Sequence, residues 1–126
     1  MKQINNQKEL NELVIGDKPV LIDFYADWCG SCRSMMPIVE ALAEEHKESF
    51  EIVKINIDNN QDIAQQFGVM SIPALFIIKE RHVKEHMVGL QTKHQIEEKI
   101  NLYLEPINPS NIEKENKKEK QNNRMK

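Results

Sequence analysis

The sequence predicts a single α/β domain, in which a central mixed β-sheet is flanked by helices on both faces in the order β-α-β-α-β-α-β-β-α. The chain has 126 residues and is 40% apolar, which is enough for one packed domain. Residues 20–26 form a nearly continuous apolar run, typical of a central strand covered on both faces. Helix-like and strand-like periodicities then alternate, and the last two strand-like segments follow each other directly. We place this domain at residues 1–105.

The first part of the chain predicts a short strand and a helix. Ile4 belongs to the strand, and Asn6 with Glu9 three residues later forms a capping pattern that begins the helix. The apolar face of the helix repeats at helical spacing in Leu10, Leu13 and Val14. Gly16-Asp17-Lys18-Pro19 ends the helix before the central strand, because glycine and proline are poor helix formers.

The middle part predicts a long helix, a strand and a short helix. Apolar residues at helical spacing favour a helix over about residues 31–48, with Pro37 inside it. A strand is expected over residues 52–57, because apolar and polar residues alternate there. The short helix covers residues 62–67, and Gly68 is expected to end it.

The last part predicts a hairpin and a final helix. Residues 74–78 and 83–88 are strand-like, and the charged turn between them contains no glycine, so its type stays open. Thr92 with Gln95 forms a capping-box pattern at the start of the helix, and Pro106 closes it. The apolar stripe of the helix consists of Ile96, Ile100, Tyr103 and Leu104.

Charge and hydropathy exclude several classes of protein. The formal net charge is −3, yet residues 106–126 hold six Lys and Arg against three Glu, so the predicted domain is acidic. An acidic domain argues against nucleic-acid binding.

The polar 106–126 segment cannot bury much apolar surface, so we expect a disordered tail. No run approaches the roughly 18 apolar residues of a membrane span. The N-terminus also lacks the apolar core of a secretory signal, so we expect a cytoplasmic protein.

Cys29 and Cys32 can form a redox disulfide, contribute to a zinc site or have no chemical role. Zinc needs four ligands, and the remaining ones would have to come from four histidines, of which His82 and His86 stand four residues apart but on a predicted strand and not on a helix. These histidines are His46, His82, His86 and His94. In a reducing compartment such a pair is not a structural crosslink. We therefore favour redox chemistry and expect no metal.

The position of the pair supports a redox role. Cys29 directly follows the apolar strand and precedes a helix, whose unpaired N–H groups and dipole favour a thiolate. The thiolate is the form that attacks disulfides. Cys32 lies one helical turn later, close enough to react with a mixed disulfide on Cys29. Gly30 and Ser31 keep the intervening segment small.

The segment Phe24-Tyr25-Ala26-Asp27-Trp28-Cys29-Gly30-Ser31-Cys32-Arg33 resembles the active-site segment of thioredoxins. Pro37 in the following helix, Ile72-Pro73 before a strand, and Gly89 after the hairpin stand at matching positions. The resemblance covers about residues 3–105. It implies a thioredoxin fold and a protein-disulfide reductase, whose only redox group is the Cys29–Cys32 disulfide and which needs no metal or organic cofactor.

The resemblance also implies roles for individual residues. Cys29 is expected to be the nucleophile and Cys32 the buried resolving thiol, and Trp28 packs beside the disulfide. Pro73 matches the family's cis-proline, whose loop pairs with the extended substrate peptide. The substrate-binding positions that carry over are Trp28, Gly30, Ile72, Pro73 and Gly89.

Asp23 lies inside the apolar strand, where burial should raise the pKa of its carboxyl group. The resemblance implies that this acid moves protons to and from Cys32. Lys54, on the neighbouring predicted strand, matches a lysine that can pair with it. The alternative is that Asp23 has no chemical role or faces water.

The resemblance implies protein disulfides as substrates, thioredoxin reductase as electron donor, and a monomer. Ser31 replaces the usual proline, which should alter the reduction potential, and we expect a less reducing protein. Tyr25, Met70-Ser71 and Ala74 also depart from the commonest pattern and leave substrate preference open. Two other functions remain: an isomerase or oxidant, and a binding subunit that uses the fold without redox turnover.

Overall fold

The computed structural model describes residues 1–104, and the predicted tail over 106–126 lies outside them. The predicted element order is confirmed. The strands are β1 (Lys2–Gln3), β2 (Val20–Tyr25), β3 (Glu51–Asn56), β4 (Ala74–Lys79) and β5 (His82–Val88). The helices are α1 (Gln7–Val14), α2 (Gly30–Glu45), α3 (Gln61–Gln66) and α4 (Lys93–Leu102). Within the described residues, no helix is both long and apolar enough to cross a membrane.

The five strands form one mixed sheet in the order β1-β3-β2-β4-β5. β3 runs parallel to both β1 and β2, whereas β4 runs antiparallel to β2 and to β5. The apolar strand β2 therefore lies at the centre, and all six of its residues are buried. This burial on both faces explains why its sequence shows no alternation of polar and apolar residues.

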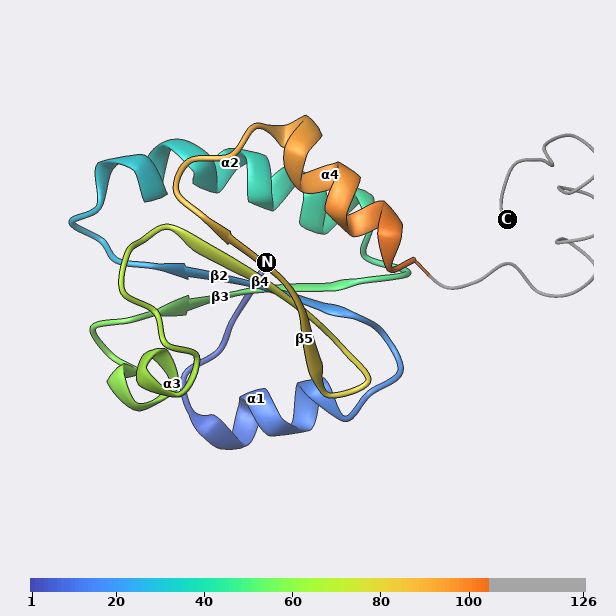
Figure 1. Cartoon of the computed structure of the whole chain (residues 1–126), viewed down its shortest axis with the longest axis horizontal. Helices are drawn as coiled ribbons and strands as arrows, with labels where there is room; N and C mark the ends of the chain where they lie inside the picture. The colour runs from blue at the N-terminus through green and yellow to red at the C-terminus, as the bar shows by residue number, and fades with distance from the viewer. Residues whose placement is uncertain (105–126) are drawn as a thin grey trace, which may run out of the picture.

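Each face of the sheet carries its own core, because successive side chains of a strand point to opposite faces. α1 and α3 cover one face, and α2 and α4 cover the other (Figure 1). The first core joins Val20, Ile22 and Phe24 of β2 to Leu10 of α1 and Ile63 of α3. The second core joins Leu21 of β2 to Met35, Val39 and Leu42 of α2 and to Ile96 and Ile100 of α4.

Two predicted helix starts are confirmed by their caps. The Asn6 side chain accepts a hydrogen bond from the Glu9 backbone N–H at 2.9 Å. At α4, the Thr92 hydroxyl accepts from the Gln95 N–H at 3.1 Å, and the Gln95 side chain accepts from the Thr92 N–H at 2.9 Å. These bonds satisfy backbone donors that the first turn of a helix leaves free.

Helix α2 begins one residue earlier and ends earlier than the predicted span of 31–48. Its end is set by the core, because Phe50 is buried and the chain must turn back to reach β3. The turn is closed by the Ser49 and Phe50 N–H groups, which both donate to the His46 carbonyl, at 3.0 and 2.8 Å. Helical periodicity continues through this segment, and the sequence pattern therefore overestimates the length of the helix.

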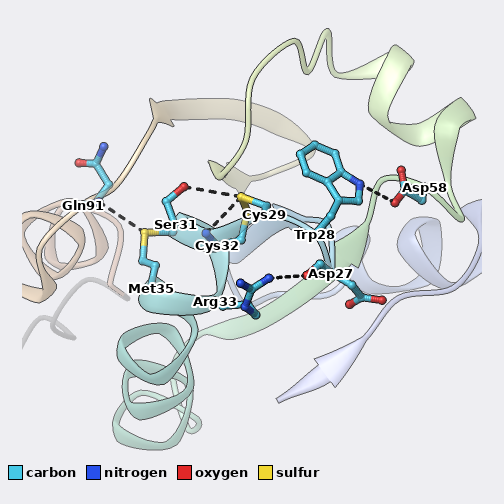
Figure 2. Close-up of a disulfide and its surroundings, with 9 residues drawn as sticks. All are labelled: Asp27, Trp28, Cys29, Ser31, Cys32, Arg33, Met35, Asp58 and Gln91. Carbon is cyan, nitrogen blue, oxygen red and sulfur yellow. Dashed lines mark hydrogen bonds between the residues drawn. A yellow bond between two sulfur atoms is a disulfide. The ribbon is translucent and has the colours of Figure 1, made fainter.

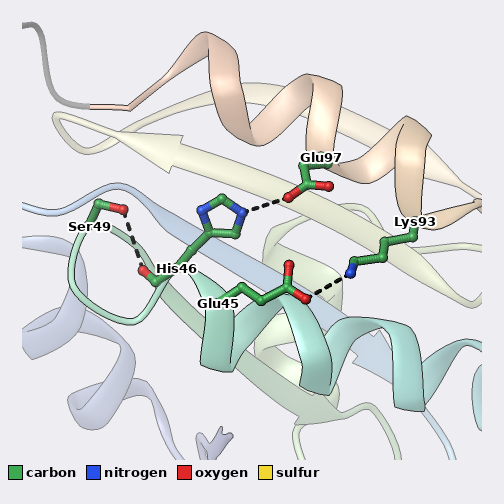
Figure 3. Close-up of polar contacts among 5 residues, drawn as sticks. All are labelled: Glu45, His46, Ser49, Lys93 and Glu97. Carbon is green, nitrogen blue, oxygen red and sulfur yellow. Dashed lines mark hydrogen bonds and ion pairs between the residues drawn. The ribbon is translucent and has the colours of Figure 1, made fainter.

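Polar contacts join the end of α2 to α4 (Figure 3). The Lys93 ammonium lies 2.7 Å from a Glu45 carboxylate oxygen, and His46 Nε2 lies 3.1 Å from Glu97 Oε2. The lysine pair is nearly half exposed, so its contribution to stability is small compared with that of the apolar contacts below it.

The β4–β5 turn, whose type the sequence leaves open, has positive φ at both central residues, 55° at Glu80 and 68° at Arg81. Positive φ at both positions is the signature of a type I′ turn, which matches the twist of the two strands. Gly68 also has a positive φ of 68°, as predicted for the residue that ends α3.

Candidate active site

Cys29 and Cys32 form a disulfide at the N-terminus of α2, just beyond the end of β2 (Figure 2). Their Cα atoms lie 5.2 Å apart. Cys29 is the N-cap residue, and its sulfur accepts a hydrogen bond from the Cys32 backbone N–H at 3.2 Å. Cys29 retains 6% exposure and Cys32 only 1%, so Cys29 is the more exposed residue of the pair.

The surroundings of the disulfide favour negative charge on Cys29 after reduction. The first turn of α2 contains no acidic residue, and its free N–H groups and helix dipole point toward the Cys29 sulfur. The Ser31 hydroxyl lies 3.6 Å from that sulfur. Arg33 donates to the Asp27 carbonyl at 2.7 Å, which fixes a cation next to this turn. Each of these groups stabilises a thiolate more than a neutral thiol.

Trp28 directly precedes the disulfide and is 66% exposed. Its indole N–H donates to a carboxylate oxygen of Asp58 at 2.9 Å (Figure 2). Asp58 follows β3, at the same end of the sheet as the end of β2. Sequence reasoning missed Asp58, because nothing in its local pattern distinguishes it from an ordinary loop aspartate.

The Ile72–Pro73 peptide bond is cis, as the resemblance implies. Ile72 packs against the buried cluster that contains both cysteines. The Gly89 N–H donates to the Pro73 carbonyl at 2.8 Å, and Gly89 has a φ of 89°, which favours glycine. The fold therefore brings the disulfide, the proline loop and the segment after β5 together, although they are far apart in the sequence.

Asp23 is buried in the middle of β2, with 1% of its surface exposed. It lies on the same sheet face as Leu21 and Tyr25, the face that α2 covers and below the cysteine cluster. Neither carboxyl oxygen has a hydrogen-bond partner among the described residues. Burial raises the pKa of the Asp23 carboxyl from 3.8 to about 7, and the positive charge of Lys54 opposes this rise. The burial expected for Asp23 is confirmed, and the pKa of its carboxyl is raised, as that burial predicts.

Lys54 lies directly opposite Asp23 in the register of β2 and β3. Within residues 1–104, however, no Lys54–Asp23 ion pair is formed, and the Lys54 ammonium lies 5.6 Å from the centroid of the Tyr25 ring. The lysine therefore acts on the carboxyl through its charge and not through a direct contact. A pocket of about 400 Å³ lies beside the Lys54 side chain. The residues that line it include Tyr25, Cys32, Arg33, Met36 and Lys54.

The alternative zinc site is not assembled around the cysteines in the described part of the chain. Both sulfurs are bonded to each other. His46 lies at the opposite end of α2, about 20 Å from Cys32 at 1.5 Å per residue. His46 instead lies close to the carboxylates of Glu45 and Glu97, and the ligand atoms of these three residues are within 4.8 Å of one another.

The chain matches the thioredoxin family model over residues 1–102. It is 39% identical to a thioredoxin of Porphyra purpurea over 104 residues, which is 82% of this chain and 97% of that protein. It is 44% identical to a thioredoxin of Bacillus subtilis over 85 residues, 68% of this chain and 82% of the relative.

Solved structures show the same fold. A point-mutant thioredoxin from Halobacterium salinarum superposes with a TM-score of 0.77 at 37% identity, covering 84% of this chain and 92% of that one. The Fasciola hepatica thioredoxin also gives 0.77, at 28% identity, over 82% of this chain and 99% of that one. Together with the Cys29–Cys32 disulfide, these matches make the protein a thiol–disulfide oxidoreductase that acts as a protein-disulfide reductase. The chain belongs to the thioredoxin family.

Proposed function

We propose that Cys29 is the attacking residue and Cys32 the resolving residue of this reductase. The Cys29 thiolate attacks one sulfur of a protein disulfide, forms a mixed disulfide and releases the other sulfur as a thiolate. Cys32, after losing its proton, attacks the Cys29 sulfur, which forms the Cys29–Cys32 disulfide and releases the second target thiolate. The target gains two electrons and the enzyme loses two. The observation that carries this assignment is the greater exposure of Cys29 at the N-cap of α2.

Asp23 is the proposed proton acceptor for Cys32. Its pKa of about 7 makes both protonation states available at neutral pH, which suits a group that takes up and returns a proton. Its oxygens have no competing hydrogen-bond partner among residues 1–104. Asp23→Asn should therefore slow resolution of the mixed disulfide at neutral pH with little change in fold. Unchanged resolution kinetics across pH 6–9 would remove Asp23 from the mechanism.

The remaining assignments follow from the same site. The backbone around Ile72 and Pro73, with Gly30, Trp28 and Gly89 around it, is the proposed contact for an extended substrate peptide. Thioredoxin reductase is the proposed electron donor, and the protein is proposed to act as a cytoplasmic monomer with no metal or organic cofactor. Lys54 is proposed to tune Asp23 by its charge, in accordance with its effect on the pKa of that carboxyl.

Reduction of insulin disulfides in the presence of thioredoxin reductase tests the role assignment. Wild type should turn over, and both Cys29→Ser and Cys32→Ser should be inactive. Only Cys32→Ser should accumulate covalent adducts with the target, because Cys29 can still attack but no thiol resolves the product. Trapping by Cys29→Ser instead would reverse the two roles.

Two further measurements separate the remaining functions. A reduction potential near −270 mV is typical of a reductase, whereas one near −180 mV is typical of a disulfide isomerase. A change of about 30 mV corresponds to about 1.4 kcal/mol. The potential also measures the effect of Ser31 between the cysteines. A double Cys29→Ser, Cys32→Ser variant that fully replaces the wild type in cells would favour a binding subunit.

A further inference from the structure

The sheet face that α1 and α3 cover retains a groove beside the β4–β5 turn. Figure 1 shows this turn next to the C-terminal end of α1. The groove has a volume of about 370 Å³ and lies between α1, the end of α3 and the strands β4 and β5. Its apolar lining includes Leu10, Val14, Phe67, Phe76, Ile78 and Val83. This volume falls within the usual range for small-molecule sites, about 300 to 1,000 Å³.

The apolar wall of the groove is fixed by the core beneath it. Phe76 and Ile78 of β4 are almost fully buried, and the Phe67 ring meets the Phe76 ring edge-on, with centroids 5.2 Å apart. Val83 of β5 pairs with Ile78 and is still 52% exposed. An aliphatic chain in the groove would therefore remove apolar surface of Val83 from water without any rearrangement of the core.

The end of the groove at the β4–β5 turn is positively charged. Arg81 lines the groove and also an adjoining pocket of about 750 Å³. The charged side chains that line this second pocket are Asp17, Lys18, Lys79, Glu80 and Arg81. The Lys18 ammonium donates to the Lys47 carbonyl at 3.1 Å, whereas Lys79 and Arg81 take part in no ion pair within residues 1–104. Two cations therefore remain available to a ligand in an otherwise acidic domain.

An apolar wall that ends at a free guanidinium group suits a ligand with an apolar chain and one anionic end. A guanidinium group binds a carboxylate through two parallel hydrogen bonds, which makes arginine well suited to this anion. We propose that the groove binds an aliphatic carboxylate, with its chain against Phe76 and Val83 and its carboxylate on Arg81.

This site is separate from the disulfide. Ile78 pairs with Val20 at the start of β2, whereas the cysteines lie beyond Tyr25 at the end of that strand. The groove also lies on the α1 and α3 face of the sheet, and the disulfide lies at the start of α2, which covers the other face. The inference therefore goes beyond the proposed reductase function and does not depend on it.

Titration of the full chain, followed by its backbone amide NMR signals, tests the proposal with three probes. Octanoate carries both the chain and the charge, octanol carries the same chain without the charge, and acetate carries the charge without the chain. The variants are Arg81→Gln and Val83→Ser. Their matched controls are Lys84→Gln and Val88→Ser, because Lys84 is an exposed cation and Val88 is 51% exposed on the same strand, and neither residue lines the groove or the adjoining pocket.

Octanoate should bind wild type at one saturable site with a Kd below about 1 mM, and the shifted signals should come from α1 and the β4–β5 turn. Acetate should show no saturable binding, and octanol should bind about tenfold more weakly than octanoate. Arg81→Gln should weaken octanoate about tenfold and leave octanol unchanged, whereas Val83→Ser should weaken both about threefold. Both controls should bind as wild type does.

Three results would overturn the proposal. The first is no saturable binding of octanoate to wild type below about 1 mM. The second is octanol binding as tightly as octanoate, which would mean that Arg81 contributes nothing. The third is Lys84→Gln weakening octanoate as much as Arg81→Gln does, which would indicate attraction to the general charge of the hairpin and not a defined site.

Discussion

Replacing Asp23 by asparagine should stabilise the oxidised protein at pH 8 but much less at pH 4. The Asp23 carboxyl has a pKa of about 7 in the folded protein, against an ordinary value of 3.8 that applies to the unfolded chain. Between these two values the folded protein retains a proton that the unfolded chain has lost. The stability of the wild type therefore falls as the pH rises from about 4 to about 7, and the loss is complete above pH 7.

The size of the effect follows from the same difference in pKa. At 1.36 kcal/mol for each pH unit, it amounts to about 4 kcal/mol above pH 7. Asparagine has a similar shape and never ionises, so it avoids this penalty at every pH. At pH 5 the variant should be more stable than the wild type by only about 1 to 2 kcal/mol. This pH lies little more than one unit above 3.8, the pKa of the unfolded chain, so only part of the full penalty applies there.

Urea unfolding followed by circular dichroism, at intervals from pH 4 to pH 8, measures this difference directly. Asp17→Asn is the matched control, because Asp17 is an exposed aspartate in the loop before β2. Other titrating groups affect wild type and variant alike and cancel in the comparison. A stability difference that stays constant from pH 4 to pH 8 would show that burial does not raise the pKa of Asp23.

Three further perturbations test the parts that hold the site in place. Thr92→Ala removes one half of the α4 capping box and should cost about 1 kcal/mol in urea unfolding, whereas an unchanged midpoint would mean that the cap contributes nothing. Gly89→Ala should cost about 1 kcal/mol or more, because its φ of 89° disfavours a side chain while the space around it is open; wild-type stability would contradict this. Asp58→Ala should lower the fluorescence anisotropy of Trp28, whose indole loses its 2.9 Å hydrogen bond, and an unchanged anisotropy would show that packing alone holds the ring.

Local sequence patterns predict a helix or strand well where the residues that begin or end it lie close together in the sequence. Asn6 and Thr92 marked helix starts, since capping depends on residues only three positions away. Gly68 marked the end of α3 for a similar reason. The sequence pattern predicts an end for α2 that is too late, because the actual end depends on the core position of Phe50. The type I′ turn at Glu80 and Arg81 stayed open, since such turns usually contain glycine or asparagine.

The site was predictable where chemistry follows from residue type, and less so where it depends on distant contacts. The spacing of Cys29 and Cys32, and their position after a buried strand, favour the redox disulfide that the structure contains. The Trp28–Asp58 bond joins residues 30 positions apart and leaves no local signal. The sequence predicts Lys54 on the strand beside Asp23, and the register of β2 and β3 agrees. Register alone does not determine where a long side chain places its ammonium group, which here lies near the Tyr25 ring.

Asp23 also shows how the fold and the chemistry constrain each other. An aspartate in the central strand, with no hydrogen-bond partner for its oxygens among residues 1–104, opposes folding at neutral pH. An apolar residue at this position would pack against the neighbouring core without that penalty. Departures from local folding rules of this kind are expected at functional sites. Because Asp23 lies on the face of β2 that α2 covers, the face that also carries the cysteine cluster, the proton exchange with Cys32 that we propose would account for a carboxyl group that packing alone does not explain.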